Sequence, residues 1–355
     1  MRIMRRPRAL TAVVASALLL AGCGSGPSQA GAAAVVGDTA ISLDKVQELI
    51  DKAIREQPYA QKLASEHKLD VLGRAFVGQL VTHELLAQVA EKENVSPDPG
   101  RIDGQLANDP LNQPVPANST DETTAVSQVA SRTRDHREEL TDTYLAQRLA
   151  DKLMPNLTVT FDFTSVGLLP TADGGAAPQG EAARAEAFEL ARQFAANPAS
   201  ATPRIAQDMQ TEQAARQSAA QSGQNVDNIP PLGGLGVAQP AAQASVLATT
   251  PLFGSPAGTV TVFPYPSLQG VWFVGVVRQR SADKPVATEQ ATPPDATTKT
   301  AIGIRLLQPY LDQLGVRINP RYGAWDVMTM NVLPEGSAST MGLTLLPGST
   351  APAQQ

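Results

Sequence analysis

The sequence predicts an α+β fold, with a mainly helical domain that carries a small β-hairpin and a separate α/β module later in the chain. Two observations predict it. Residues 35–94 contain short β-prone runs followed by apolar residues at helical spacing. Residues 157–280 instead combine β-branched and aromatic runs with one helical stretch and glycine-rich loops. With 355 residues, 42% of them hydrophobic, the chain is long enough for two domains.

The first 34 residues predict export and a lipid anchor. A basic start is followed by an apolar run over residues 9–20, which is too short to span a bilayer well. A Leu-Ala-Gly-Cys sequence ending at Cys23 matches the bacterial lipobox. We therefore expect residues 1–22 to be a lipoprotein signal peptide, Cys23 to be lipidated, and residues 23–34 to be a flexible tether. The protein would lie on the extracytoplasmic face of the bacterial cell membrane. An ordinary secretory signal with a chance cysteine is the alternative.

Charge and composition exclude several classes of function. The net charge is −6, and the basic residues of the predicted signal make the remainder more acidic still. No basic stripe follows, so we expect neither nucleic acid nor nucleotide as a partner. Cys23 is the only cysteine, which leaves no disulfide framework and no thiolate metal site. His83-Glu84 begins like a zinc-binding H-E-x-x-H motif, but position 87 is alanine. The sequence predicts no catalytic residue, no metal and no cofactor.

The predicted helical domain begins with a hairpin and two helices. Gly37-Asp38 suits a two-residue turn between β-prone runs, and Ser42 can cap the helix that follows. The second helix, over residues 71–94, is apolar on more than one side. Such a helix is either buried against several neighbours or presents a surface to a binding partner. Residues 95–118 read mostly as loop, and residues 119–154 as one or two further helices.

The α/β module is predicted from strands over residues 157–169 and 271–278 and a helix over residues 180–196. Residues 197–224 are rich in Ala and Gln and poorly patterned, which indicates a loose helix, and residues 230–236 read as a turn-rich loop. The remaining boundaries are a linker over 281–297, a helix over 298–315, a strand at 316–318 and a polar, disordered tail over 331–355.

The order of these elements resembles a known family. The residues that carry the resemblance in the first domain are Val35, Val36, Gly37, Asp38, Ile41, Ser42, Leu80, Glu84, Leu85, Leu86, Ala90, Val95, Ser96 and Pro97. They resemble the N-terminal domain of SurA/PrsA-type extracytoplasmic chaperones. Residues 157–280 resemble a parvulin-type peptidyl-prolyl isomerase in order and spacing. The N-P-R-Y-G-x-W-D sequence at 319–326 implies that residues 298–330 return to complete the domain of residues 35–156, with 316–318 beside the opening hairpin.

The resemblance also implies that the isomerase module is degenerate. A parvulin-type site is expected to hold a histidine in its first strand and another in its last, yet the three histidines of this chain all lie outside residues 157–280. Asp162 and its neighbours stand where the first histidine is expected, and Trp272 stands at the second position. An altered pocket would therefore be formed by Asp162, Phe263 and Trp272.

These observations favour a lipid-anchored, ATP-independent chaperone that holds unfolded or secreted polypeptides in an apolar cradle. The candidate client-binding residues are Phe76, Leu80, Leu86, Tyr144 and Tyr310. For each of them, an ordinary place in the hydrophobic core is the alternative. Two other functions stay open: an active prolyl isomerase with an altered pocket, and an accessory envelope lipoprotein that binds one protein partner.

Overall fold

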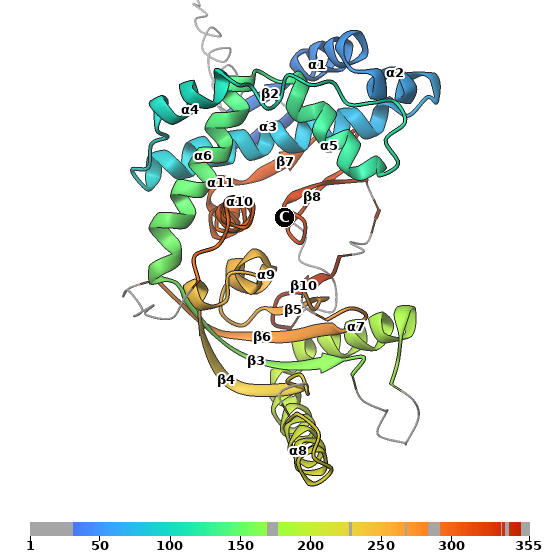
Figure 1. The fold of residues 1–355 in the computed structure, drawn as a ribbon, viewed down its shortest axis with the longest axis vertical. Coiled ribbons are helices and arrows are strands. Elements are labelled where there is room, and N and C mark those ends of the chain that lie inside the picture. The colour runs from blue at the N-terminus through green and yellow to red at the C-terminus, as the bar shows by residue number, and fades with distance from the viewer. Residues whose placement is uncertain are drawn as a thin grey trace, which may run out of the picture.

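The computed structural model describes residues 31–168, 177–226, 229–266, 268–282, 292–334, 336–337 and 341–348. The protein is an α+β structure with antiparallel sheets. Figure 1 shows helices gathered at one end of the molecule and a larger sheet at the other. The predicted signal peptide and lipidation site at Cys23 lie outside the described residues, as do residues 283–291 of the predicted linker.

The described part of the chain begins in a three-stranded sheet whose strands come from two segments far apart in the sequence. Strands β1 (Ala32–Val36) and β2 (Thr39–Ser42) form the hairpin, and Gly37 takes the positive φ of its turn. Strand β7 (Val316–Ile318) pairs with the other edge of β1. The predicted position of residues 316–318 beside the hairpin is confirmed. The predicted tether ends too late, because alanines 32–34 are buried in β1 between two partner strands.

Six helices follow the hairpin: α1 (Leu43–Glu56), α2 (Pro58–Ser65), α3 (Leu69–Lys92), α4 (Pro99–Leu106), α5 (Glu122–Thr133) and α6 (His136–Leu153). The Ser42 hydroxyl accepts a hydrogen bond from the Lys45 amide, as predicted for the cap of α1. Helix α3 is the centre of this helical part, because α1, α5, α6 and β1 all pack against it.

A five-stranded antiparallel sheet forms the other end of the molecule, in the order β10-β5-β6-β3-β4. Its strands are β3 (Thr158–Val166), β4 (Gly233–Pro240), β5 (Val260–Pro264), β6 (Trp272–Ser281) and β10 (Leu343–Leu345). Helix α7 (Gly180–Ala196) packs on one face, and α9 (Pro251–Gly254) and α10 (Ala296–Arg305) contribute to the core on the other. Helix α8 (Ala201–Gln221) projects from the β4 edge, at the end of the molecule farthest from α1 and α2 (Figure 1).

Several segments that the sequence left irregular are ordered elements. The loop expected at 230–236 contains the start of β4. The loose helix expected within residues 197–224 is found as α8, which is a regular helix. The expected disordered tail supplies β9 (Asn331–Leu333), which pairs with β8 (Ala324–Asp326), and then β10. These three-residue strands are too short to show an alternation pattern. They are defined by their backbone hydrogen bonds to partner strands, which are β8 for β9 and β5 for β10.

The return to the helical part is a broken helix. The linker expected at 281–297 begins inside β6 and ends inside α10. The single helix expected over 298–315 is divided into α10, a 3₁₀ turn and α11 (Leu311–Leu314), because Pro309 has no amide to continue the ladder. The 3₁₀ turns that lie wholly within the described residues include Met154–Asn156, Pro198–Ser200, Ala241–Gln243, Leu247–Thr249 and Gln308–Tyr310.

Helix α10 joins the helical and sheet parts at two points. Arg305 is buried and donates hydrogen bonds to the carbonyls of Thr249, Val327 and Met328 and to the side chain of Gln308, at 2.6–3.0 Å. Gly303 lies directly against the backbone of Ala146 in α6. Both contacts place α10 between α6 and the sheet.

Candidate functional site

The three residues of the expected isomerase pocket do not share a pocket. Phe263 and Trp272 belong to adjacent strands, and their side chains lie on opposite faces of the sheet because side chains alternate along a strand. Phe263 stacks on Phe273 with a centroid separation of 4.9 Å, on the face of α9 and α10. Trp272 meets the Phe188 ring of α7 edge-on at 5.5 Å, on the other face. The prediction that Phe263 and Trp272 line one altered isomerase pocket is therefore wrong.

The face of the sheet that holds Phe263 is a packed core. Phe161, Phe163, Phe263, Tyr265 and Phe273 form a continuous set of ring contacts, with Phe163 stacked on Phe273 at 5.1 Å. All four phenylalanines are buried. These rings therefore form part of the hydrophobic core that stabilises the sheet.

The residues expected to form a client-binding cradle also lie mostly in the core. Phe76, Leu80 and Leu86 are buried along α3, among the several elements that pack around this helix. The breadth of the apolar surface of α3 thus reflects its many neighbours within the chain. These three side chains are not accessible to a client in this structure. The prediction that they form an exposed client-binding cradle is therefore wrong.

The two candidate tyrosines are held by contacts within the chain. Tyr144 is buried in a small cluster with Ile102 and Leu140, and the Arg101 guanidinium lies 4.3 Å from its ring centre. Tyr310 is half-buried, and its hydroxyl donates to the Glu93 carboxylate at 2.7 Å. Burial and this hydrogen bond raise the pKa of Tyr310 to about 12. Neither ring forms part of an open apolar surface.

An open groove lies instead beside α8, where the helix meets the start of β4. Its volume is about 730 Å³. Met209 and Leu235 line it with 40% and 37% of their surface exposed, and they are two of the five large apolar side chains that are exposed among the described residues. The remaining lining is small or polar: Ala206, Gln210, Glu212, Gln213, Arg216, Gln217, Ala220, Val226 and Gly233.

Helix α8 is fixed to the sheet at its N-terminal end. Ile205 is buried and its side chain lies against Gly233. One helical turn later, Asp208 accepts a hydrogen bond of 2.5 Å from the Thr164 hydroxyl of β3. The helix therefore begins on the face of the sheet, and its later turns extend beyond β4, so that one long side faces the groove.

Two charged side chains of α8 bond residues that lie between this helix and β4 in the sequence. Glu212 accepts from the Leu232 amide at 2.8 Å. Arg216 donates to the carbonyls of Val226 and Ile229 at 2.9 and 2.7 Å. Glu212 and Arg216 also pair with each other at 2.8 Å, so the groove carries little net charge from them.

Asp162 has a structural role in this groove. Strand β4 bulges opposite Asp162, where Gly236 takes a φ of +61° and donates its amide to Asp162 Oδ1 at 2.7 Å. The other carboxylate oxygen binds the Arg278 guanidinium at 2.6 and 2.7 Å. A bulge of this kind redirects the neighbouring side chain. Asp162 therefore helps to present Leu235 to the groove.

Sequence reasoning missed Met209, Leu235 and the groove they line. Residues 197–224 have no apolar periodicity, because α8 buries only Ala201, Ile205 and Ala219. The available signal was a methionine and a leucine isolated among Ala, Gln and Gly. Such isolated apolar residues are normal on protein surfaces and do not by themselves predict a site.

In comparisons with known proteins, no protein-family model and no curated protein matches the chain. Within the described residues, no helix has both the length and the hydrophobicity needed to cross a membrane.

Proposed function

We propose that this protein is a lipid-anchored, extracytoplasmic, ATP-independent chaperone that holds extended segments of unfolded or secreted polypeptides in the groove beside α8. The observation that carries the proposal is the open groove of about 730 Å³, which Met209 and Leu235 line. The client-binding surface is thus assigned to α8 and β4 in place of the buried residues of α3.

The chemistry of the groove suits a polypeptide of variable sequence. Met209 has a flexible thioether side chain that adapts to different apolar partners. Gln210, Gln213 and Gln217 each offer both hydrogen-bond donors and acceptors, which match the amide groups of a peptide backbone. Strand β4 is at the edge of the sheet, and residues 235, 236 and 238 are exposed. An unfolded segment lying in the groove can therefore contact apolar side chains, side-chain amides and the backbone of β4.

The proposal includes the finer architecture that the sequence resemblance implies. The pairing of β1 with β7 supports a helical chaperone domain composed of residues 35–156 and 298–330. The antiparallel order β4-β3-β6-β5 supports a parvulin-like insert over residues 157–280. We propose that this insert is degenerate and has no isomerase activity, since its sequence contains no histidine and its aromatic rings are packed as core.

The groove provides a direct test of holdase activity. We expect the full-length protein to suppress the aggregation of a denatured client whose refolding is limited by proline isomerisation, and to leave the refolding rate constant unchanged. The double variant Met209→Ser, Leu235→Ser should lose most of the suppression, because it removes the two large apolar contacts without touching the core. Light scattering and refolding fluorescence measure the two effects.

Val246→Ser is the matched control. Val246 is 50% exposed and does not line the groove, so this variant should suppress aggregation like the parent protein. Equal suppression by the parent and the double variant would reject the groove as the client site. No suppression by the parent at several-fold excess would reject the chaperone function itself, and a refolding rate that increases with protein concentration would reject the degenerate insert.

The lipid anchor has its own test. Cys23→Ser removes the thiol that the lipid would modify, so we expect the variant to leave the membrane fraction while the parent remains in it. Mass spectrometry of the N-terminal peptide should show a diacylglyceryl group on the parent alone. A parent peptide with an unmodified Cys23 would reject the anchor.

A further inference from the structure

His136, the first residue of α6, has a hydrogen-bond acceptor at each of its two ring nitrogens. Nδ1 lies 2.5 Å from an Asp109 carboxylate oxygen, and Nε2 lies 3.0 Å from the Arg132 carbonyl oxygen. A neutral imidazole carries a single N–H and can donate to one of them. Both contacts are hydrogen bonds only when the ring is an imidazolium. The geometry around His136 is therefore that of a protonated histidine.

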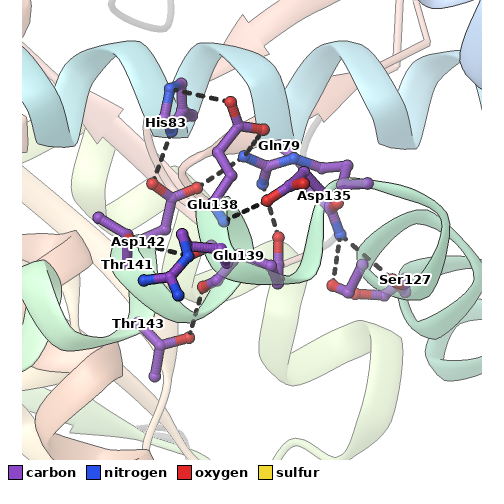
Figure 2. Close-up of polar contacts among 12 residues, drawn as sticks. Gln79, His83, Ser127, Asp135, Glu138, Glu139, Thr141, Asp142 and Thr143 are labelled. Carbon is purple, nitrogen blue, oxygen red and sulfur yellow. Dashed lines mark hydrogen bonds and ion pairs between the residues drawn. The ribbon is translucent and has the colours of Figure 1, made fainter. Parts of the chain in front are cut away.

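His83 of α3 has a similar environment, which Figure 2 shows: its ring points from α3 toward two carboxylates of α6. Nδ1 lies 2.6 Å from Asp142 and Nε2 lies 3.6 Å from Glu138. Protonation gives His83 a second N–H directed at Glu138 and places a positive charge beside both acids. Two of the three histidines of the chain thus tie the same helix, α6, to other segments.

The acids around His83 outnumber the cations. Arg134, just before α6, is buried and binds Glu138, Glu139 and Asp142 at 3.1, 2.6 and 2.8 Å. One guanidinium therefore faces three carboxylates within the first turns of α6. A proton on His83 reduces this excess of negative charge at a partly buried site, where charge interactions are screened less than at the surface.

The contact of His136 closes a strap over the helical part. Residues 107–121 link α4 to α5, and Val115 in their middle is buried, with its amide bonded to Gln57 and its carbonyl to the Tyr59 amide. Asp109 holds the first half of this strap to α6 through His136. Beside it, Leu111 lines a cavity of about 220 Å³ together with Ser131 and Glu139. Losing the bond to Asp109 would free this half of the strap.

We propose that His83–Asp142 and His136–Asp109 form an acid-strengthened clasp, which holds α6 to α3 and to the strap of residues 107–121 when both rings are protonated and loosens as a rise in pH removes these protons. The clasp is independent of the proposed chaperone function. The charged groups that face His83 are Asp142, Glu138 and Arg134, and those that face His136 are Asp109 and Lys52 of α1.

The pKa directions agree with this geometry. The hydrogen bond to Asp142 raises the pKa of His83 against the opposing effect of burial. For His136, burial is the largest influence and lowers the pKa, but the Arg132 carbonyl and Asp109 together outweigh it, so the pKa is raised. A raised folded-state pKa stabilises the folded form fully below the unfolded-state pKa of a histidine, about 6.5, and this stabilisation is lost as the pH rises through the folded-state pKa.

Amide hydrogen exchange of the full-length protein between pH 6 and 8 tests the clasp. After correction for the intrinsic effect of pH on exchange, we expect several-fold more opening of residues 107–121 at pH 8 than at pH 6. In the variant His83→Asn, His136→Asn, opening at pH 6 should already match the level at pH 8. His67→Asn is the matched control, because His67 is exposed and asparagine tolerates its positive φ.

A second measurement covers the case in which the double variant does not fold. NMR titration of the parent protein should give midpoints for the His83 and His136 rings above the ordinary value for histidine, and Asp109→Asn should lower the midpoint of His136 alone. Midpoints at or below the ordinary value, or corrected exchange of residues 107–121 that does not change with pH in the parent, would overturn the proposal.

Discussion

Replacing Arg305 with methionine is expected to lower the free energy of unfolding by about 4 kcal/mol, because it leaves several buried acceptors without a donor. The guanidinium bonds the carbonyls of Thr249, Val327 and Met328, which no apolar side chain can satisfy. Burial lowers the pKa of Arg305 to about 10, which still leaves it charged at neutral pH. Chemical denaturation of the full-length chain measures the loss.

Two further variants define what Arg305 contributes. Arg305→Lys should recover little stability, since one ammonium group cannot reach acceptors that a planar guanidinium meets in several directions. Arg317→Met is the control, because Arg317 is exposed on β7 and its replacement should change stability by less than about 0.5 kcal/mol. If Arg305→Met unfolds at the same denaturant concentration as Arg317→Met, the hydrogen bonds of Arg305 do not hold the helical and sheet parts together.

The substitution Gly303→Ala is expected to destabilise the protein by at least about 2 kcal/mol, because it overpacks a helix contact. A Cβ atom at this position would overlap the Ala146 carbonyl and lie 2.8 Å from the Ala146 Cα atom. These are backbone atoms, so no side-chain rotation can make room. Helices α6 and α10 would have to move apart. Thermal unfolding compared with the parent protein detects the change.

Gly104→Ala is the control for this helix substitution. Gly104 lies in α4 with nothing within 4 Å of the added Cβ, so alanine should be neutral or stabilise the helix by up to about 1 kcal/mol. The contrast separates close packing from helix propensity. Equal unfolding temperatures for the two alanine variants would show that the contact between α6 and α10 can accommodate an added methyl group.

The elements with a long apolar pattern could be predicted from the sequence. The helix over residues 180–196 has the predicted bounds, because its buried side recurs at helical spacing and packs on the sheet. The strand at 158–166 is likewise found inside its predicted range. Strand β10 could not be predicted, because three residues carry no period, and its position depends on the free edge of β5.

The candidate site was predicted less well, for two physical reasons. Apolar residues of α3 read equally as core or as a binding surface, and only the packing of other elements decides which one they are. The groove beside α8 depends on a bulge at Gly236 and on the bonds of Arg216 to the returning chain. Neither the bulge nor the path of that chain has a pattern in the sequence. The charged clasp at α6 depends in the same way on contacts between residues far apart in the chain.

The pairing of β1 with β7 has a consequence for the order in which the protein folds. Val36 pairs with Val316, so β1, the central strand of the three-stranded sheet, gains its second partner from a segment far along the chain. Strands β3, β4, β5 and β6 of the five-stranded sheet can pair earlier, since their contacts are more local in sequence. Pairings between distant segments close slowly. The pairing of residues 316–318 with β1 is therefore a late step of folding, and until then one edge of β1 is open to other unpaired strands.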